Sequence, residues 1–252
     1  DSVRCNSNKS EDRHVLVNFS ANGASEELKQ ALSLDSLFGL KGLVAVVTGG
    51  GTGLYHGRRE EVLKQAVDNY HKHAKGEIIG LQADVTNKAD LERIIGKISE
   101  KEPNGIQILV NNAGISGPKM EAFSNGHTIH AISGMVNISQ NHFAYNASKA
   151  AAIHLTKMMA CELANSQIRF NSIAPGVFPS AMTAKKGSDD RGKSDISESF
   201  DASKYKIPAG RPGRLQEMAA SILYLCGKGC QYCDGLVMNV DGGILLTNPS
   251  AC

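Results

Sequence analysis

From residue 43 onward, short runs rich in valine and isoleucine alternate with longer segments of helical pattern. The apolar runs lie at 43–47, 77–81 and 106–110, and the helical patterns between them lie at 60–74 and 88–100. Strands that alternate with helices predict a parallel sheet built from βαβ units. The runs are continuously apolar, as expected where helices cover both faces of a sheet. The pattern therefore predicts an α/β protein with an open, doubly wound parallel sheet.

The second half of the chain continues the alternation. A helical pattern at 145–163 precedes an apolar run at 168–173, and a second helical pattern at 215–226 precedes a last apolar run at 236–240. A chain of 252 residues with 41% hydrophobic content can bury one large core. We therefore expect one large domain.

Two segments differ from this pattern in composition. Residues 1–36 are mixed and polar, with one short helical pattern at 25–32, and we interpret them as an extension outside the main fold. Residues 179–205 are charged and rich in serine, and they follow the carboxyl end of a predicted strand, where ligands bind in doubly wound folds. A long excursion of this kind is either disordered or a functional lid, and both interpretations stay open.

Charge and cysteine content limit the classes of partner. A formal net charge of +2 gives no electrostatic reason to expect nucleic acid binding. No apolar stretch approaches the roughly 20 residues that span a bilayer. Residues 1–10 lack the apolar core of a secretory signal, so we expect a cytoplasmic protein. Of six cysteines, only Cys230 and Cys233 have metal-ligand spacing, and no second pair stands nearby, so we expect ordinary thiols and no metal.

Tyr145 and Lys149 stand four residues apart in a predicted helix, so their side chains share one face. The ammonium of Lys149 beside the phenol would favour the anionic form of Tyr145. Such a tyrosine can exchange protons with a carbonyl or carbinol oxygen. The alternative is an ordinary surface helix. The glycine-rich sequence at 48–53, which directly follows an apolar run, favours redox chemistry on a nicotinamide nucleotide instead.

Six short motifs occur in order along the chain: 48–53 (TGGGTG), 84–85 (DV), 111–114 (NNAG), 145–149 (YNASK), 174–176 (APG) and 240–243 (VDGG). In that order the motifs resemble those of the classical short-chain dehydrogenase/reductase family over residues 37–252. The resemblance implies a Rossmann-like fold and a nicotinamide cofactor. It also implies hydride transfer between that cofactor and a small-molecule carbonyl or secondary alcohol.

The resemblance assigns roles to individual residues. Tyr145 would be the general acid/base, Lys149 its partner and ribose anchor, and Ser133 a stabiliser of the substrate oxygen. A guanidinium at Arg58 suits the 2′-phosphate of NADP, although NAD stays an alternative. The glycine loop would let backbone amides approach the pyrophosphate. The implied cofactor-binding residues are Gly49, Gly51, Thr52, Gly53, Arg58, Asp84, Val85, Asn112, Ala113, Gly114, Tyr145, Lys149, Pro175, Gly176, Phe178 and Ser180.

Two stretches of the family pattern are missing. Only three residues separate the glycine loop from residues 57–59, whereas a parallel crossover needs about a dozen. The usual second strand therefore cannot form in its place. Either residues 60–74 become the helix after the glycine loop, with Arg58 near the pyrophosphate, or the amino-terminal half is damaged.

The second gap lies between Gly114 and Ser133. It leaves no room for the helix that carries the family's catalytic asparagine and, in many members, half of the dimer interface. A homo-oligomer would therefore lack its usual contact. Ala131 occupies the position of the family serine, and Ser133 is the nearest substitute. We expect the fold to have lost one strand and one or two helices, through splicing, an incomplete gene model or true shortening of the protein.

Two functional hypotheses follow. The first is an NADP(H)-dependent oxidoreductase that uses Tyr145 and Lys149. The second is a catalytically silent nucleotide-binding or scaffold protein that keeps part of the fold. Ala131 and the two gaps favour the second hypothesis, whereas the retained dyad and the motif at 240–243 favour the first. The sequence does not indicate the substrate.

Overall fold

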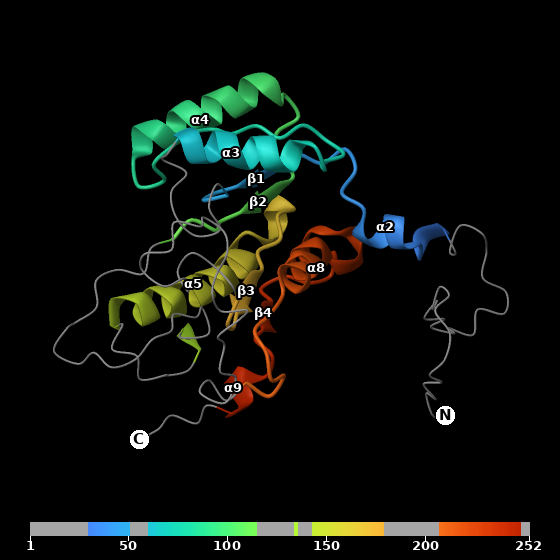
Figure 1. The fold of residues 1–252 in the computed structure, drawn as a ribbon, viewed down its shortest axis with the longest axis vertical. Coiled ribbons are helices and arrows are strands. Elements are labelled where there is room, and N and C mark those ends of the chain that lie inside the picture. The colour runs from blue at the N-terminus through green and yellow to red at the C-terminus, as the bar shows by residue number, and fades with distance from the viewer. Residues whose placement is uncertain (1–29, 51–59, 115–133, 136–142, 179–206, 248–252) are drawn as a thin grey trace.

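The computed structural model of the chain describes residues 30–50, 60–114, 134–135, 143–178 and 207–247 (Figure 1). Four short strands in these ranges form two separate parallel pairs. β1 (Ala45–Val47) pairs with β2 (Ile108–Val110), and β3 (Ser172–Pro175) pairs with β4 (Val237–Val240). Helices connect the strands, so the predicted α/β class with parallel strands is confirmed.

Two helices lie between β1 and β2 in the sequence. α3 (Glu60–His71) has acidic residues in its first turn and His71 in its last, a distribution that complements the helix dipole. α4 (Lys88–Lys101) begins at Asn87, whose side chain accepts hydrogen bonds from the backbone of the first turn. Leu63 on α3 and Ile94 on α4 line a common groove, so the two helices are neighbours.

The predicted strand at 77–81 is wrong. Residues 72–87 are all described, and they contain no strand. Gly80 packs instead against the side chains of Leu63 and Val67 on α3. In a doubly wound sheet the third strand is hydrogen-bonded to the second. Among the described residues no strand lies beside this segment, so it has no neighbour there with which to form a ladder, as expected if the second strand is missing.

The carboxyl-terminal half holds the buried core and a long helix, α5 (Phe143–Glu162), followed by a single turn, η3 (Ala164–Ser166). The predicted strand at 168–173 forms later, at β3. Residues 168–170, which were expected to begin the strand, lie outside it. There the N–H of Phe170 donates a hydrogen bond to the carboxylate of Asp234 at 2.7 Å. The buried apolar side chains gather around β3 and the residues that follow it, and they are Ala174, Val177, Ile207 and Ile244.

α8 (Leu215–Cys226) occupies the range predicted for it. It begins where the N–H of Arg214 donates to the carboxylate of Glu217 at 2.7 Å. A turn, η4 (Lys228–Cys230), leads from α8 towards β4, and α9 (Ile244–Thr247) follows β4. No helix in the described ranges is long and apolar enough to cross a membrane.

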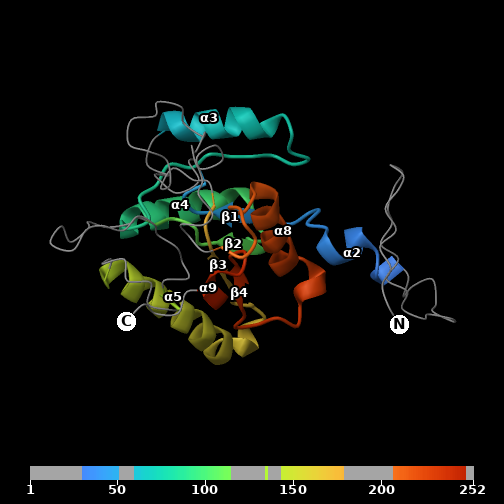
Figure 2. The same cartoon turned by 60° about the horizontal axis from the view of Figure 1, so that its bottom comes forward.

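A short helix not anticipated from the sequence, α2 (Leu34–Phe38), lies against α8 in both views (Figures 1 and 2). The rings of Phe38 and Tyr224 are 6.5 Å apart between centroids. The side chain of Ser33 caps the helix by accepting a hydrogen bond from the N–H of Ser36. α2 spans the predicted boundary between residues 36 and 37, and the division of the chain at that boundary stays a prediction.

Candidate active site

The ends of β1 and β2 are joined by a hydrogen-bond network centred on Thr48. The hydroxyl oxygen of Thr48 accepts from the N–H groups of Asn112 and Ala113, both at 3.0 Å. The side-chain amide of Asn112 donates to the carbonyl of Thr48 at 3.1 Å. The first residues of the glycine loop are thereby fixed against the 111–114 segment, although about 60 residues of sequence separate them.

Gly49 needs to be a glycine at this contact. Its φ is +70°, in the left-handed region that favours glycine. A methyl group at this position would lie 3.0 Å from the Cα of Ala113. At Gly114, by contrast, no atom of the described residues lies within 4 Å of such a methyl group. The start of the loop therefore packs closely against the strand end at Ala113.

Helix α5 brings Tyr145 and Lys149 together as their spacing predicts. The ammonium nitrogen of Lys149 lies over the ring of Tyr145, 5.2 Å from its centroid. Both side chains are half-buried. Burial lowers the pKa of Lys149 below its ordinary value, because a low-dielectric environment disfavours the ammonium form.

Gly134 lies directly against this part of α5. A methyl group on Gly134 would come within 2.5 Å of the carbonyl carbon of Lys149 and of the backbone nitrogen of Ala150. Residue 134 therefore contacts the helix backbone at the lysine itself. The structure thus places Gly134 beside the helix that carries the dyad.

The ends of β3 and β4 form a second close contact. The N–H of Gly176 donates to the carbonyl of Val240 at 2.9 Å, and a methyl group on Gly176 would lie 2.6 Å from the Cα of Asp241. The carboxylate of Asp241 accepts from the N–H groups of Gly243 and Leu245, both at 2.9 Å. The 174–176 and 240–243 motifs therefore share one strand end, with Pro175 on β3 itself.

The ring of Phe178 lies close to Gly213, where a methyl group would overlap its Cε1 and Cζ atoms. Phe178 is thus held against the residues that precede α8. This contact positions the chain just after Gly176, where the family resemblance implies that Phe178 binds the cofactor.

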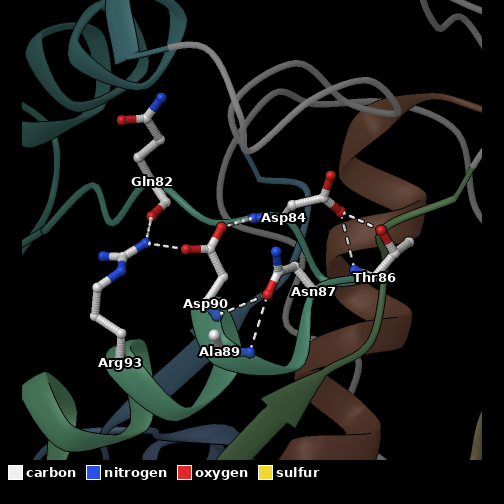
Figure 3. A network of polar contacts seen from close by, with 7 residues as sticks. All are labelled: Gln82, Asp84, Thr86, Asn87, Ala89, Asp90 and Arg93. Atoms are coloured by element: carbon white, nitrogen blue, oxygen red, sulfur yellow. Dashed lines mark hydrogen bonds and ion pairs between the residues drawn. The ribbon is translucent and has the colours of Figure 1, made fainter.

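Asp84 belongs to a polar network at the start of α4 (Figure 3). Its carboxylate accepts from the N–H and hydroxyl of Thr86 at 2.9 and 2.7 Å, and its own N–H donates to Asp90 at 2.9 Å. The pKa of Asp90 lies below its ordinary value because that N–H and the guanidinium of Arg93 both donate to its carboxylate. Val85 beside this network is 42% exposed. The network fixes the turn that presents Val85 to solvent.

Several predicted site residues lie outside the described residues, and their roles stay predictions. They are Gly51, Thr52, Gly53, Arg58, Ser133 and Ser180. Within the described ranges, no group of three or more histidine, cysteine or acidic residues gathers in a way that could hold a metal ion.

Two residues that the sequence analysis did not single out shape the site. Thr48 appeared only as the first letter of the glycine motif, and Asp241 only as part of the 240–243 motif. Each acts by satisfying backbone N–H groups of the loops at the strand ends. The signal available in the sequence was a residue with a short oxygen-bearing side chain directly after an apolar run, a type suited to binding nearby backbone groups.

Comparison with known proteins defines the family. Residues 38–140 match the family described as short chain dehydrogenase, and residues 120–245 match the one described as enoyl-(acyl carrier protein) reductase. The short-chain dehydrogenase/reductase PhomF of Diaporthe leptostromiformis is 33% identical, over 90% of this chain and 99% of PhomF. The rhamnolipids biosynthesis 3-oxoacyl-(acyl-carrier-protein) reductase of Pseudomonas aeruginosa is 28% identical, over 83% of this chain and 98% of that enzyme.

Solved structures indicate the same family. The RhlG/NADP active-site complex of Pseudomonas aeruginosa superposes with a TM-score of 0.66 at 27% identity, covering 82% of this chain and 98% of that one. A short-chain type dehydrogenase/reductase from Mycobacterium marinum gives a TM-score of 0.68 at 27% identity, covering 84% and 99%. The chain belongs to the classical short-chain dehydrogenase/reductase family and has its Rossmann-type fold. It is therefore an oxidoreductase of that family.

The length of the alignment bears on the missing segments. The match to PhomF runs over 304 residues, more than the 252 residues of this chain. Stretches of PhomF therefore have no counterpart here. This agrees with a shortened member of the family, while the positions of the two gaps stay a prediction.

Proposed function

We propose that the protein is an NADP(H)-dependent reductase or dehydrogenase that acts on a carbonyl or secondary alcohol through Tyr145 and Lys149. The observation that carries the proposal is the position of the Lys149 ammonium, 5.2 Å from the centroid of the Tyr145 ring on one face of α5. A cation at this distance favours the anionic form of the phenol.

The described residues suit a dinucleotide at the β1–β2 edge. Gly49 lets the loop backbone lie against Ala113, and among the described residues no atom lies within 4 Å of a side chain at Gly114. The close approach that glycine allows at these positions suits the binding of a pyrophosphate by backbone N–H groups. Gly49, Asn112, Ala113 and Gly114 would hold the adenosine half, and a nicotinamide cofactor, when bound, supplies or accepts the hydride.

The protein's own contribution is the proton. In the direction of reduction, the hydroxyl of Tyr145 donates a proton to the carbonyl oxygen of the substrate. In the direction of oxidation, the phenolate accepts a proton from the carbinol. The half-buried ammonium of Lys149 would stabilise that phenolate and bond a ribose hydroxyl, the role that the family resemblance implies. Gly134 sets the position of the helix at Lys149 by direct backbone contact.

Two observations favour NADP over NAD. The solved relative from Pseudomonas aeruginosa at 27% identity is described as a complex with NADP. The guanidinium of Arg58 suits a 2′-phosphate but lies outside the described residues. We propose NADP(H) as the cofactor and a small carbonyl compound or secondary alcohol as the substrate class.

The test combines cofactor binding with turnover. Purified protein should change NADPH fluorescence at micromolar concentration and should oxidise NADPH with members of a panel of ketones and quinones. Tyr145→Phe should abolish turnover and leave NADPH affinity nearly unchanged, because the hydroxyl serves proton transfer. Lys149→Ala should weaken both.

Equal turnover in the wild type and Tyr145→Phe would refute the mechanism. Binding of NADPH with no turnover across the panel would instead support a silent nucleotide-binding protein. No response to NADPH or NADH would exclude a cofactor-dependent enzyme altogether.

A further inference from the structure

The turn between α8 and β4 carries two thiols that the proposed reaction does not use. Cys230 ends the turn η4, and Cys233 follows three residues later. The N–H of Cys233 donates to the carbonyl of Cys230 at 3.0 Å. A hydrogen bond of this kind closes a four-residue turn and brings its end residues within about 7 Å between Cα atoms. That range overlaps the 4.4–6.8 Å that disulfides require.

The side chains around the turn also lie close together. The hydroxyl of Tyr224, on α8, lies 3.6 Å from the sulfur of Cys233. Cys230, Cys233 and Tyr224 each shift the pKa of the others, as expected of neighbouring groups. The turn therefore holds the two cysteines at a spacing that a disulfide can bridge.

The two cysteines differ in access to solvent. Cys230 is fully buried, whereas Cys233 is partly exposed and follows Tyr232, whose side chain is entirely exposed. A small oxidant can reach Cys233 first. Cys230 is then held behind it as the second, resolving thiol. This is the arrangement expected of a redox-active pair and not of two inert core cysteines.

The pKa shifts of the two thiols also favour reaction of Cys233 before Cys230. Hydrogen bonds from Cys230 and Tyr224 lower the pKa of the Cys233 thiol, because both donate to the sulfur once it is a thiolate. Burial raises the pKa of the Cys230 thiol. The guanidinium of Arg169 donates to the carbonyl of Cys233 at 3.0 Å and adds positive charge beside the pair.

We propose that Cys230 and Cys233 form a reversible intramolecular disulfide, and that low-molecular-weight disulfides such as oxidised glutathione are the oxidants. The thiolate of Cys233 attacks one sulfur of oxidised glutathione, forms a mixed disulfide and releases one glutathione, which takes up a proton. The thiol of Cys230 loses its proton and attacks the sulfur of Cys233, forming the protein disulfide and releasing the second glutathione. Two protein thiols are oxidised and one glutathione disulfide is reduced.

The placement of the pair gives the disulfide a structural consequence. The carbonyl of Cys233 also accepts a hydrogen bond from the side chain of Asn171 at 2.9 Å, next to the start of β3. Leu236, just before β4, donates its N–H to the same side chain at 3.0 Å. Oxidation would lock the turn that enters β4, the strand whose far end contacts Gly176.

The experiment uses the full chain, reduced and then exposed to oxidised glutathione under native conditions. Remaining thiols are alkylated, and the protein is cleaved after aromatic residues, which separates Cys230 from Cys233 at Tyr232. Mass spectrometry should find the two peptides joined by a disulfide. The link should persist in Cys226→Ser and Cys252→Ser, because neither residue belongs to the pair.

Single variants separate the two roles. Cys230→Ser should stop the reaction at a glutathione adduct on Cys233, and Cys233→Ser should block it. Tyr224→Phe should slow the first step by about threefold, since a tenfold loss of thiolate is partly offset by the greater nucleophilicity of a more basic thiolate. Cys161, exposed on α5, is the reference thiol and should react more slowly than Cys233.

Three results would overturn the proposal. They are a wild-type protein that accumulates only the glutathione adduct, a disulfide from Cys233 to a cysteine other than Cys230, and a Cys233 that reacts no faster than Cys161. All three are read from the wild-type chain, so the test does not depend on the folding of a variant.

Discussion

Replacing Thr48 by valine should destabilise the protein through two unsatisfied backbone donors. The N–H groups of Asn112 and Ala113 both bond the Thr48 hydroxyl oxygen at 3.0 Å, and valine keeps the shape of threonine without that oxygen. An unpaired buried donor costs about 1–3 kcal/mol. Because Thr48 is only half-buried and Ala113 is exposed, water can partly replace the lost bonds. We therefore take the lower end of that range, about 1 kcal/mol, for each donor. The two donors together give an expected loss of about 2 kcal/mol in the free energy of unfolding.

Thr48→Ser is the matched control, since it keeps the oxygen and removes one methyl group. It should cost less than about 1 kcal/mol. Urea unfolding gives both free energies, and the melting temperature of Thr48→Val should fall by about 4–8 °C for a domain of this size. NADPH affinity should fall with stability, because the same bonds hold Gly49 against Ala113. Equal stability in Thr48→Val and Thr48→Ser would refute the role given to the hydroxyl.

Two further substitutions test the site and its support. In Gly134→Ala, the new methyl group would lie 2.5 Å from the carbonyl carbon of Lys149, whereas an ordinary contact begins at 3.4 Å. The chain must therefore move by ~0.9 Å. Turnover should then drop by roughly 100-fold. Gly96→Ala on α4 is the control and should leave turnover unchanged, because no atom of the described residues lies within 4 Å of its new methyl group. Bonds from Arg211 and then from the Arg214 N–H lower the pKa of Glu217 from 4.5 to about 2. The melting temperature of wild type should therefore exceed that of Glu217→Gln above pH 4.5, and the difference should vanish as pH falls towards 2.

Helices were predicted well because their signals are local. α8 occupies the predicted range, and α4 and α5 agree with theirs to within a few residues. The spacing of Tyr145 and Lys149 alone places both on one helix face. A strand depends on its neighbour, so the apolar run at 77–81 was predicted as a strand and forms none.

The parts of the site that could not be predicted from the sequence depend on contacts between residues far apart in the chain. The bonds of Thr48 reach residues 64 and 65 positions away. The packing of Gly134 on α5 and the meeting of Tyr224 with Cys233 likewise need the folded chain. The short α2 helix was missed because its five residues carry too little periodicity to indicate a helix.

The contacts at the strand ends do not depend on the segments predicted to be missing. The contact between residues 48–49 and 112–113 joins one pair of strands, and that between Gly176 and Asp241 joins the other. Each contact is made across the sheet edge, so the intervening segments can lengthen or shorten without changing the geometry at the strand ends. Deletions in those segments would remove residues around the site and leave these two contacts in place. Segments between the two contacts could therefore vary in length while Thr48, Gly176 and Asp241 keep their partners.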